Sequence, residues 1–232
     1  MIVLNCGMPK SGTTYVMELQ KDLVALANPQ NGIGKTQELG FVQQFNKENV
    51  TAILSLEEKY GDLIIKTHSP PTDCIKSFIE SGKVKTTFNF RDPRDTILSV
   101  VDHGARTRNG KDASGAFANI HSIKDALSFA KASIQLYYQW KEYGHALFIK
   151  YEDLMMNKVD HLFGMARYFG YMLDNNLVMN IYEKHENMKE SAWNYNTGRI
   201  NRWKEEMSED WIKKINYQFG KAIEEMGYQT NL

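Results

Sequence analysis

The sequence predicts an α/β fold in which a central, mainly parallel sheet is covered by helices on both faces. Short apolar runs rich in β-branched and aromatic residues alternate with longer stretches of helical periodicity, a pattern typical of parallel strands joined by helices. The length of 232 residues and the hydrophobic content of 42% suit one domain over residues 1–232. No repeat or low-complexity segment interrupts the alternation.

The elements follow from local patterns in chain order. The apolar run 2–6 ends at Gly7 and predicts a strand, and apolar residues at helical spacing predict a helix from 13 to about 28, where Pro29 stops it. We expect further strands at 62–66, 84–90 and 146–150, further helices at 72–81, 92–104, 121–143, 155–169, 175–187 and 208–227, and polar segments at 28–40, 106–115 and 191–202.

The helix after the third strand has the clearest start. Asp92 is a suitable N-cap, Pro93 suits the first helical position, and Asp95 places an acid in the first turn. We expect this helix to end near Gly104. Two glycines interrupt the polar stretch 106–115, which predicts a mobile loop.

Composition excludes several classes of function. The formal net charge is zero and the sequence pI is about 7.0, so no attraction of the whole surface to nucleic acid or to an anionic membrane is expected. The two cysteines, Cys6 and Cys74, form no CxxC and no zinc spacing, so we expect reduced thiols and no metal. No apolar run approaches the ~20 residues of a membrane span, and no signal peptide is visible, which favours a cytoplasmic protein.

A polar residue follows each predicted strand. Lys10, His68, Arg91 and Tyr151 come after the first, second, third and fourth strands, respectively. Because parallel strands end at one edge of a sheet and ligands bind outside those ends, we expect these four side chains to meet in one crevice.

The first of these loops, Gly-Met-Pro-Lys-Ser-Gly-Thr-Thr over residues 7–14, predicts an anion site. Unpaired N–H groups and the dipole at a helix N-terminus favour an anion, and Lys10 adds a charge. Ser11, Thr13 and Thr14 add hydroxyl donors, and Gly12 permits close approach of the backbone. The pattern is not a Walker A loop, because neither glycine that such a loop requires before Lys10 is present.

Five blocks together resemble the sulfotransferases that use 3′-phosphoadenosine 5′-phosphosulfate (PAPS). The loop itself resembles the 5′-phosphosulfate loop of that family. The others, in the family's order, are Lys66-Thr67-His68-Ser69-Pro70, Arg91 with Ser99 eight residues on, Tyr151-Glu152-Asp153, and Gly198 five residues before Trp203-Lys204. The resemblance covers most of the chain and implies a P-loop-NTPase-like three-layer fold.

The resemblance also implies an in-line transfer of sulfonate from PAPS to a hydroxyl, or less favourably an amine, without a metal. Lys10 would stabilise the leaving phosphate, and His68 would accept the proton of the acceptor. Lys66 would help to hold the sulfonate. Arg91 and Ser99 would bind the 3′-phosphate, and Ser99 would also restrain the catalytic lysine.

The remaining cosubstrate contacts are less regular. The loop residues Ser11 to Thr14 would hold the 5′-phosphate. Tyr15, where the family usually has tryptophan, and Tyr151 would contact adenine or its phosphate, with half-buried packing as the alternative. Vertebrate cytosolic members have Arg-Lys-Gly near the C-terminus, where this chain has Asn196-Thr197-Gly198. We therefore expect Thr197 and Gly198 at the 3′-phosphate, with Arg199 and Arg202 supplying the missing charge.

The acceptor site is expected to form from the variable loops of the chain. We expect a small molecule or saccharide, bound by the loops 28–40, 69–74 and 106–117. Aromatic residues of the long helix and just before it are further candidates, although such residues more often belong to a core: Phe117, Tyr137, Tyr138 and Trp140. The family's dimerisation motif is not recognisable, so the oligomeric state is open.

Two alternatives remain. A P-loop kinase would need a Walker A loop and a carboxylate–magnesium site, and the first of these is missing. A nucleotide-binding relative without catalysis would have lost Lys10 or His68, and both are present.

Overall fold

The computed structural model describes residues 1–29, 40–112, 114–187 and 198–230. Its centre is a five-stranded parallel sheet with the order β2-β3-β1-β4-β5. The strands are β1 (Ile2–Gly7), β2 (Phe41–Val42), β3 (Leu63–Thr67), β4 (Val84–Phe90) and β5 (Leu147–Lys150). This architecture confirms the predicted α/β fold with a parallel sheet.

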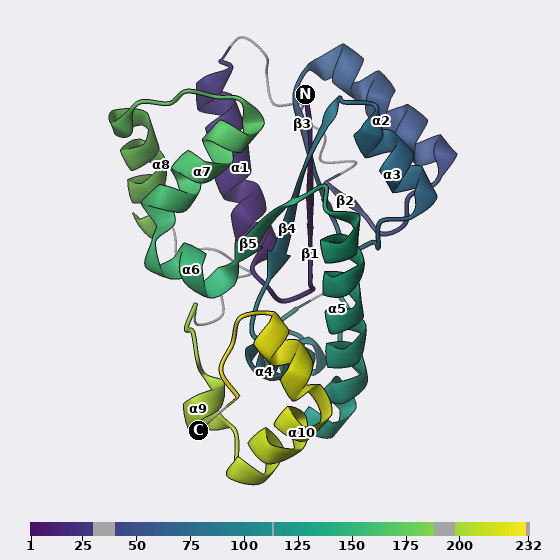
Figure 1. Ribbon diagram of the computed structural model, residues 1–232, viewed down its shortest axis with the longest axis vertical. Helices are drawn as coiled ribbons and strands as arrows, with labels where there is room; N and C mark the ends of the chain where they lie inside the picture. The colour runs from purple at the N-terminus through teal and green to yellow at the C-terminus, as the bar shows by residue number, and fades with distance from the viewer. Residues whose placement is uncertain (30–39, 113, 188–197, 231–232) are drawn as a thin grey trace.

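Helices cover both faces of the sheet (Figure 1). They are α1 (Thr13–Ala27), α2 (Lys47–Tyr60), α3 (Asp73–Glu80), α4 (Pro93–Arg108), α5 (Ile123–Tyr143), α6 (Tyr151–Met156), α7 (Lys158–Phe169), α8 (Asn175–Asn187), α9 (Trp203–Glu206) and α10 (Glu209–Glu225). In Figure 1, β1 runs downward from the N-terminus, so the carboxyl ends of the strands face α4, α9 and α10 at the bottom.

Two hydrophobic cores lie on opposite faces of the sheet. Side chains alternate along β1, so that Ile2 and Leu4 enter one core and Val3 enters the other. The first core includes residues of α2 to α5, α9 and α10, and the second includes residues of α1, α7 and α8. The strands are buried on both faces, which explains why they appear as nearly continuous apolar runs in the sequence.

Some boundaries differ from the sequence prediction. β2, α2, the short α6 and the short α9 were not expected, and the helix predicted over 155–169 begins only at Lys158, as α7. α4 continues to Arg108, so the loop predicted over 106–115 begins later than expected. Gly104 does not end this helix. A Cβ there would lie 2.5 Å from the carbonyl oxygens of Phe117 and Ile120, so glycine is required because another segment packs closely against it.

No helix within the described ranges is both long and apolar enough to cross a membrane.

Candidate active site

The loop between β1 and α1 has an unusual backbone. Lys10 has φ +68° and Gly12 has φ +83°, both in the left-handed region. At Gly12, a Cβ would lie 2.8 Å from the ring of Tyr151, so a glycine is needed for both conformation and space. Gly12 occupies the N-cap position of α1, and no side chain in the described part of the chain caps that helix. Its first N–H groups therefore point out of the helix without intrahelical partners.

The three hydroxyls of the loop have different surroundings. Ser11 is buried, and its Oγ donates to the carbonyl oxygens of Met8 at 2.6 Å and Asn89 at 3.0 Å. That hydroxyl therefore holds the loop against β4. Thr13 is also buried, whereas Thr14 is half-buried and its Oγ1 accepts a hydrogen bond from Lys66 Nζ at 3.0 Å.

Lys66 and His68 stand at the end of β3 beside this loop. The ammonium of Lys66 also lies 5.3 Å from the ring centroid of Phe41, and the His68 ring lies 5.6 Å from the same ring. Burial lowers the pKa of Lys66. Phe41 is 48% exposed and was not anticipated as a site residue, because the strand β2 that carries it has only two residues.

The contacts of His68 define its tautomer. His68 Nδ1 lies 2.7 Å from the carbonyl oxygen of Gly7. A carbonyl only accepts, so Nδ1 carries the proton and Nε2 keeps its lone pair. Burial, with a smaller contribution from Lys66, lowers the pKa of His68 to about 4. The ring is therefore neutral at pH 7.

Lys10 meets a residue that the sequence did not single out. Its Nζ lies 2.9 Å from Nδ1 of His103 on α4, and the other ring nitrogen of His103 lies 3.0 Å from Oδ2 of Asp112. Burial and the nearby Arg106 lower the pKa of Lys10 to about 8. His103 follows Lys10 by 93 residues, so no local motif could have linked the two.

Arg91 lies where β4 ends. Its Nη2 donates to Asp95 at 3.1 Å and to the carbonyl oxygen of Arg199 at 2.6 Å. The guanidinium lies 4.3 Å from the ring centroid of Tyr151, the ring that packs on Gly12. Arg91 is 6% exposed, and its buried Nε has no hydrogen-bond partner among the described residues. A buried arginine N–H without a partner is a donor that an anion can satisfy.

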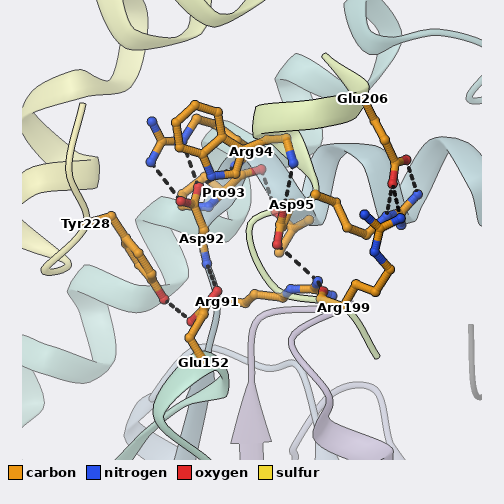
Figure 2. Close-up of polar contacts among 12 residues, drawn as sticks. Arg91, Asp92, Pro93, Arg94, Asp95, Glu152, Arg199, Glu206 and Tyr228 are labelled. Atoms are coloured by element: carbon orange, nitrogen blue, oxygen red, sulfur yellow. Dashed lines mark hydrogen bonds and ion pairs between the residues drawn. The ribbon is translucent and has the colours of Figure 1, made fainter. Parts of the chain in front are cut away.

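A network of matched charges surrounds Arg91 (Figure 2). Arg94 donates to both carboxylate oxygens of Asp92, at 3.0 and 2.7 Å, and stacks 3.6 Å from the ring centroid of Trp203. Glu152 accepts from the backbone N–H of Asp92 at 3.1 Å and from the hydroxyl of Tyr228 at 2.8 Å. Arg94 is 1% exposed, so it is a buried cation of the scaffold and not a surface residue.

The predicted C-terminal contacts are only partly described. Thr197 lies outside the described residues, while Gly198 has φ +62° and directs the chain toward Arg91. The Arg199 side chain is half exposed and pairs with Glu205 and Glu206. Arg202 is buried and binds Asp102 at 2.8 Å and Glu206 at 2.6 Å. These carboxylates raise the pKa of Arg202, so its positive charge is already matched.

The remaining predicted residues have these positions. Ser99 is buried on α4, one turn from Asp95 and one turn from His103, and so lies between the Arg91 and Lys10 contacts. Tyr15 is half-buried and lies edge-on against His185 of α8, at 5.8 Å between ring centroids. This contact favours the packing alternative for Tyr15.

A cavity of about 330 Å³ opens beside His68. Its lining comes from the loops after β1 and β3 and from α5: Pro9, His68, Pro70, Phe129, Ala132, Ser133, Gln135, Leu136 and Gln139. α5 therefore contributes to the cavity, but through other residues than expected. Tyr137 and Trp140 are buried in the core, and the hydroxyl of Tyr138 binds Glu225. Phe117 packs against His103 and Phe129, and most of the loop 28–40 lies outside the described residues.

Comparison with known proteins identifies the family of this chain. A profile of the sulfotransferase domain matches residues 2–227. The chain belongs to the sulfotransferase family. The mouse (Mus musculus) and human (Homo sapiens) sulfotransferases 4A1 are each 23% identical to it over 207 residues, which cover 85% of this chain and 71% of each relative.

Solved sulfotransferase structures share the fold. Mouse sulfotransferase SULT7A1, crystallised with PAP, superposes with a TM-score of 0.65 at 15% identity and covers 96% of this chain and 84% of its own. Retinol dehydratase, crystallised with retinol and PAP, superposes with a TM-score of 0.64 at 14% identity and covers 98% of this chain and 82% of its own. The family and the P-loop-NTPase-like fold inferred from the five sequence blocks are confirmed.

Across the described ranges of this sulfotransferase, no group of three or more His, Cys, Asp or Glu side chains is arranged to hold a metal ion. Lys10 is a cation of the loop itself, and Lys66 and Arg91 are cations beside it.

Proposed function

We propose that this sulfotransferase transfers sulfonate from PAPS to a hydroxyl group of an uncharged acceptor, with His68 as the base. The observation that carries the proposal is the tautomer of His68. Its Nδ1 is bound to Gly7, which leaves the lone pair on Nε2, and His68 lines a cavity large enough for part of a small molecule. The uncapped start of α1 lies on the other side of the same loop.

The residues of the loop and of β4 fit a bisphosphorylated adenosine. The free N–H groups at the start of α1 would take the 5′-phosphate, because a helix N-terminus binds anions. The unpartnered Nε of Arg91, with Ser99 nearby on α4, would take the 3′-phosphate. Tyr151 would orient both parts, since its ring touches Gly12 and Arg91. PAP, the 3′,5′-adenosine bisphosphate in the solved relatives, has this pattern of charge.

The transfer would follow the general scheme of an in-line displacement. The acceptor oxygen forms a bond to sulfur while its proton passes to Nε2 of His68. The bond between sulfur and the phosphate oxygen breaks, and its electron pair remains on that oxygen. Lys10 would neutralise the leaving phosphate, and Lys66, held by Thr14, would contact the sulfonate.

The cavity favours an uncharged acceptor with a hydroxyl group. Within the described part of the chain, no Lys, Arg, Asp or Glu lines it, and its polar groups besides His68 are amides and one hydroxyl. A cationic amine would therefore lose its hydration without gaining a carboxylate partner. Small alcohols, phenols and saccharides all fit this description, and an acceptor screen distinguishes them.

Calorimetric titration with PAP, run beside 5′-AMP and ATP with magnesium, tests the donor site. We expect tight binding of PAP, weak binding of 5′-AMP and no effect of magnesium. Preference for ATP with magnesium would instead indicate a phosphotransferase with an atypical loop. A screen with ³⁵S-labelled PAPS over alcohols, phenols, saccharides and amines then tests transfer. Tight PAP binding without turnover of any acceptor class would indicate a non-catalytic relative.

A further inference from the structure

We propose that His103 is a positioning residue that holds the ammonium of Lys10 at the phosphate loop, and that the negative charge of Asp112 beside Nε2 favours the tautomer His103 needs for this. The inference rests on the proposed function, in which Lys10 meets the leaving phosphate. His103 itself would touch neither cosubstrate nor acceptor.

The two contacts of the ring specify its protonation. Lys10 Nζ lies 2.9 Å from Nδ1, and Asp112 Oδ2 lies 3.0 Å from Nε2. An ammonium only donates, so Nδ1 accepts from Lys10 and the neutral ring carries its proton on Nε2. The Asp112 carboxylate lies on that side of the ring, close enough for electrostatic attraction, although the geometry is not that of a hydrogen bond. A protonated ring would place an N–H against the ammonium and break the contact. His103 and His68 therefore have opposite tautomers in adjacent parts of the site.

The ring of His103 is held from several sides. It is 7% exposed and lies edge-on against Phe117, at 5.3 Å between ring centroids. Gly104 follows it and allows the chain near Phe117 to approach α4 closely. Asp112 is fixed in turn, because its Oδ1 accepts from the backbone N–H of Ser114 at 2.8 Å. These contacts surround the ring while its Nδ1 lies toward Lys10.

Lys10 is thereby fixed at both ends. Its backbone has φ +68°, a conformation that non-glycine residues rarely adopt, and its Nζ is bound to His103. One ammonium N–H is used by Nδ1, which leaves two for oxygens of a phosphate. No proton moves to or from His103 in this arrangement. Its effect would be to set the direction in which the remaining donors point.

Several charged groups act on this pair. The charged groups that shift the pKa of Lys10 are Asp102 and Arg106 on α4, Arg91 at the end of β4, and Asp112 in the loop after α4. Those that act on His103 are Lys10, Asp112 and Arg106, and burial and Lys10 lower the pKa of His103. Both arginines disfavour the charge of Lys10. The Nδ1 acceptor offsets part of this unfavourable effect, so its removal makes Lys10 easier to deprotonate.

The test compares three variants in the full chain. His103→Asn keeps an acceptor near the position of Nδ1, His103→Leu removes it, and His121→Leu is the control at an exposed histidine. The pKa of Lys10 is measured by NMR of ¹⁵Nζ-lysine, with Lys10→Arg used to assign the signal. Affinity for PAP is measured on the same samples at pH 7.5. Thermal unfolding confirms that each variant is folded.

We expect His103→Leu to lower the pKa of Lys10 and to weaken PAP binding about tenfold, the loss of one hydrogen bond to a charged group. His103→Asn should restore both values to within about twofold of the wild type in affinity, and His121→Leu should change neither. Asp112→Ala should shift both in the direction of His103→Leu, because the ring loses the charge that favours its tautomer.

The inference is overturned if folded His103→Leu leaves the pKa of Lys10 and the PAP affinity at wild-type values. It is also overturned if folded His103→Asn is as impaired as His103→Leu, since the ring would then act by packing alone. Failure of the proposed function has a different result, because the wild-type chain itself would not bind PAP. The pKa of Lys10 remains measurable in that case and still decides the inference.

Discussion

Two clusters of buried charge lie at the carboxyl end of the sheet, and they differ in how their cations are matched. At the start of α4, Arg94 is 1% exposed and pairs with both oxygens of Asp92. At the phosphate loop, Lys10 and Lys66 bind neutral groups, an imidazole nitrogen and the hydroxyl of Thr14. Burial lowers the pKa of both lysines.

This difference distinguishes the charges that stabilise the fold from the charges that are available to bind a ligand. A buried cation with a carboxylate partner is already satisfied and fixes the elements that carry the pair. A half-buried cation whose partners are neutral, as at Lys10 and Lys66, retains an excess of charge that an anion can match. Arg91 lies between the two clusters and combines both properties, with an Asp95 partner at Nη2 and none within the described residues at Nε.

The largest expected effect is on stability, in the cluster at the start of α4 where Arg94 pairs with Asp92 (the matched cluster). Arg94→Ala leaves Asp92 buried without its partner and should lower the free energy of unfolding by about 3–5 kcal/mol. Urea unfolding measures this loss. Lys21→Ala is the control, because its pair with Glu18 is exposed and should contribute less than about 0.5 kcal/mol. Equal losses in the two variants would show that the matched cluster is not a scaffold.

The next effect is on catalysis, beside the phosphate loop. His68→Ala should lower kcat by about 10²–10⁴-fold, the usual contribution of a general base, while PAP affinity changes little. Turnover of labelled PAPS with an acceptor from the screen measures the first, and calorimetry measures the second. A collapse of PAP affinity would assign His68 to cosubstrate binding and place the base elsewhere.

Lys10→Ala should lower turnover by about 10²–10³-fold, comparable to the loss of one oxyanion donor. The protein should remain folded, because no carboxylate is left unpaired by the change. The contrast with Arg94→Ala is therefore a loss of activity with stability kept. Normal turnover of labelled PAPS in a folded Lys10→Ala variant would exclude the leaving-group role.

The pH dependence of kcat/KM for PAPS should have two limits. His68 must be neutral to accept a proton, and its pKa is about 4, so activity rises as pH increases through that value. Lys10 must be charged, and its pKa is about 8, so activity falls above that value by about tenfold for each further pH unit. A rate that continues to rise above pH 9 would contradict the role of a charged Lys10.

The smallest expected effect distinguishes the cost of a left-handed backbone conformation from the cost of a clash between a side chain and its neighbour. Gly12 and Gly82 have φ +83° and +79°, but only at Gly12 would a Cβ meet another group, the ring of Tyr151. Gly12→Ala should therefore destabilise the protein more than Gly82→Ala, by about 1 kcal/mol, and should alone weaken PAP binding. Equal unfolding free energies would show that the Tyr151 ring moves without cost.

The sequence predicted the sheet and its polar ends because those features depend on local patterns. Buried strands appear as apolar runs, and the four polar residues that follow them do reach one edge, as the contacts of His68 with Gly7 and of Tyr151 with Arg91 show. β2 and α2 were missed because they bury little. Of the fourteen residues of α2, only Ile53 is fully buried.

The matched charges and the Lys10–His103 contact could not be predicted in this way. They depend on where distant segments pack, and Arg94 resembles a surface cation until Trp203 is placed over it. Gly104 was taken as a helix end, although its small size serves contact with the chain at Phe117 and Ile120. Such pairings become visible only when the tertiary structure is known.

The strand order β2-β3-β1-β4-β5 has a consequence for how such a protein can diverge. The cavity is lined from the β3 end and α5, while Arg91 and Tyr151 follow β4 and β5 on the opposite side of β1 (Figure 1). Mutations that reshape the cavity lining can therefore occur without replacing Arg91 or Tyr151. A lineage can therefore acquire new acceptors by drift in α5 and the segment after β3 while it inherits one donor site unchanged.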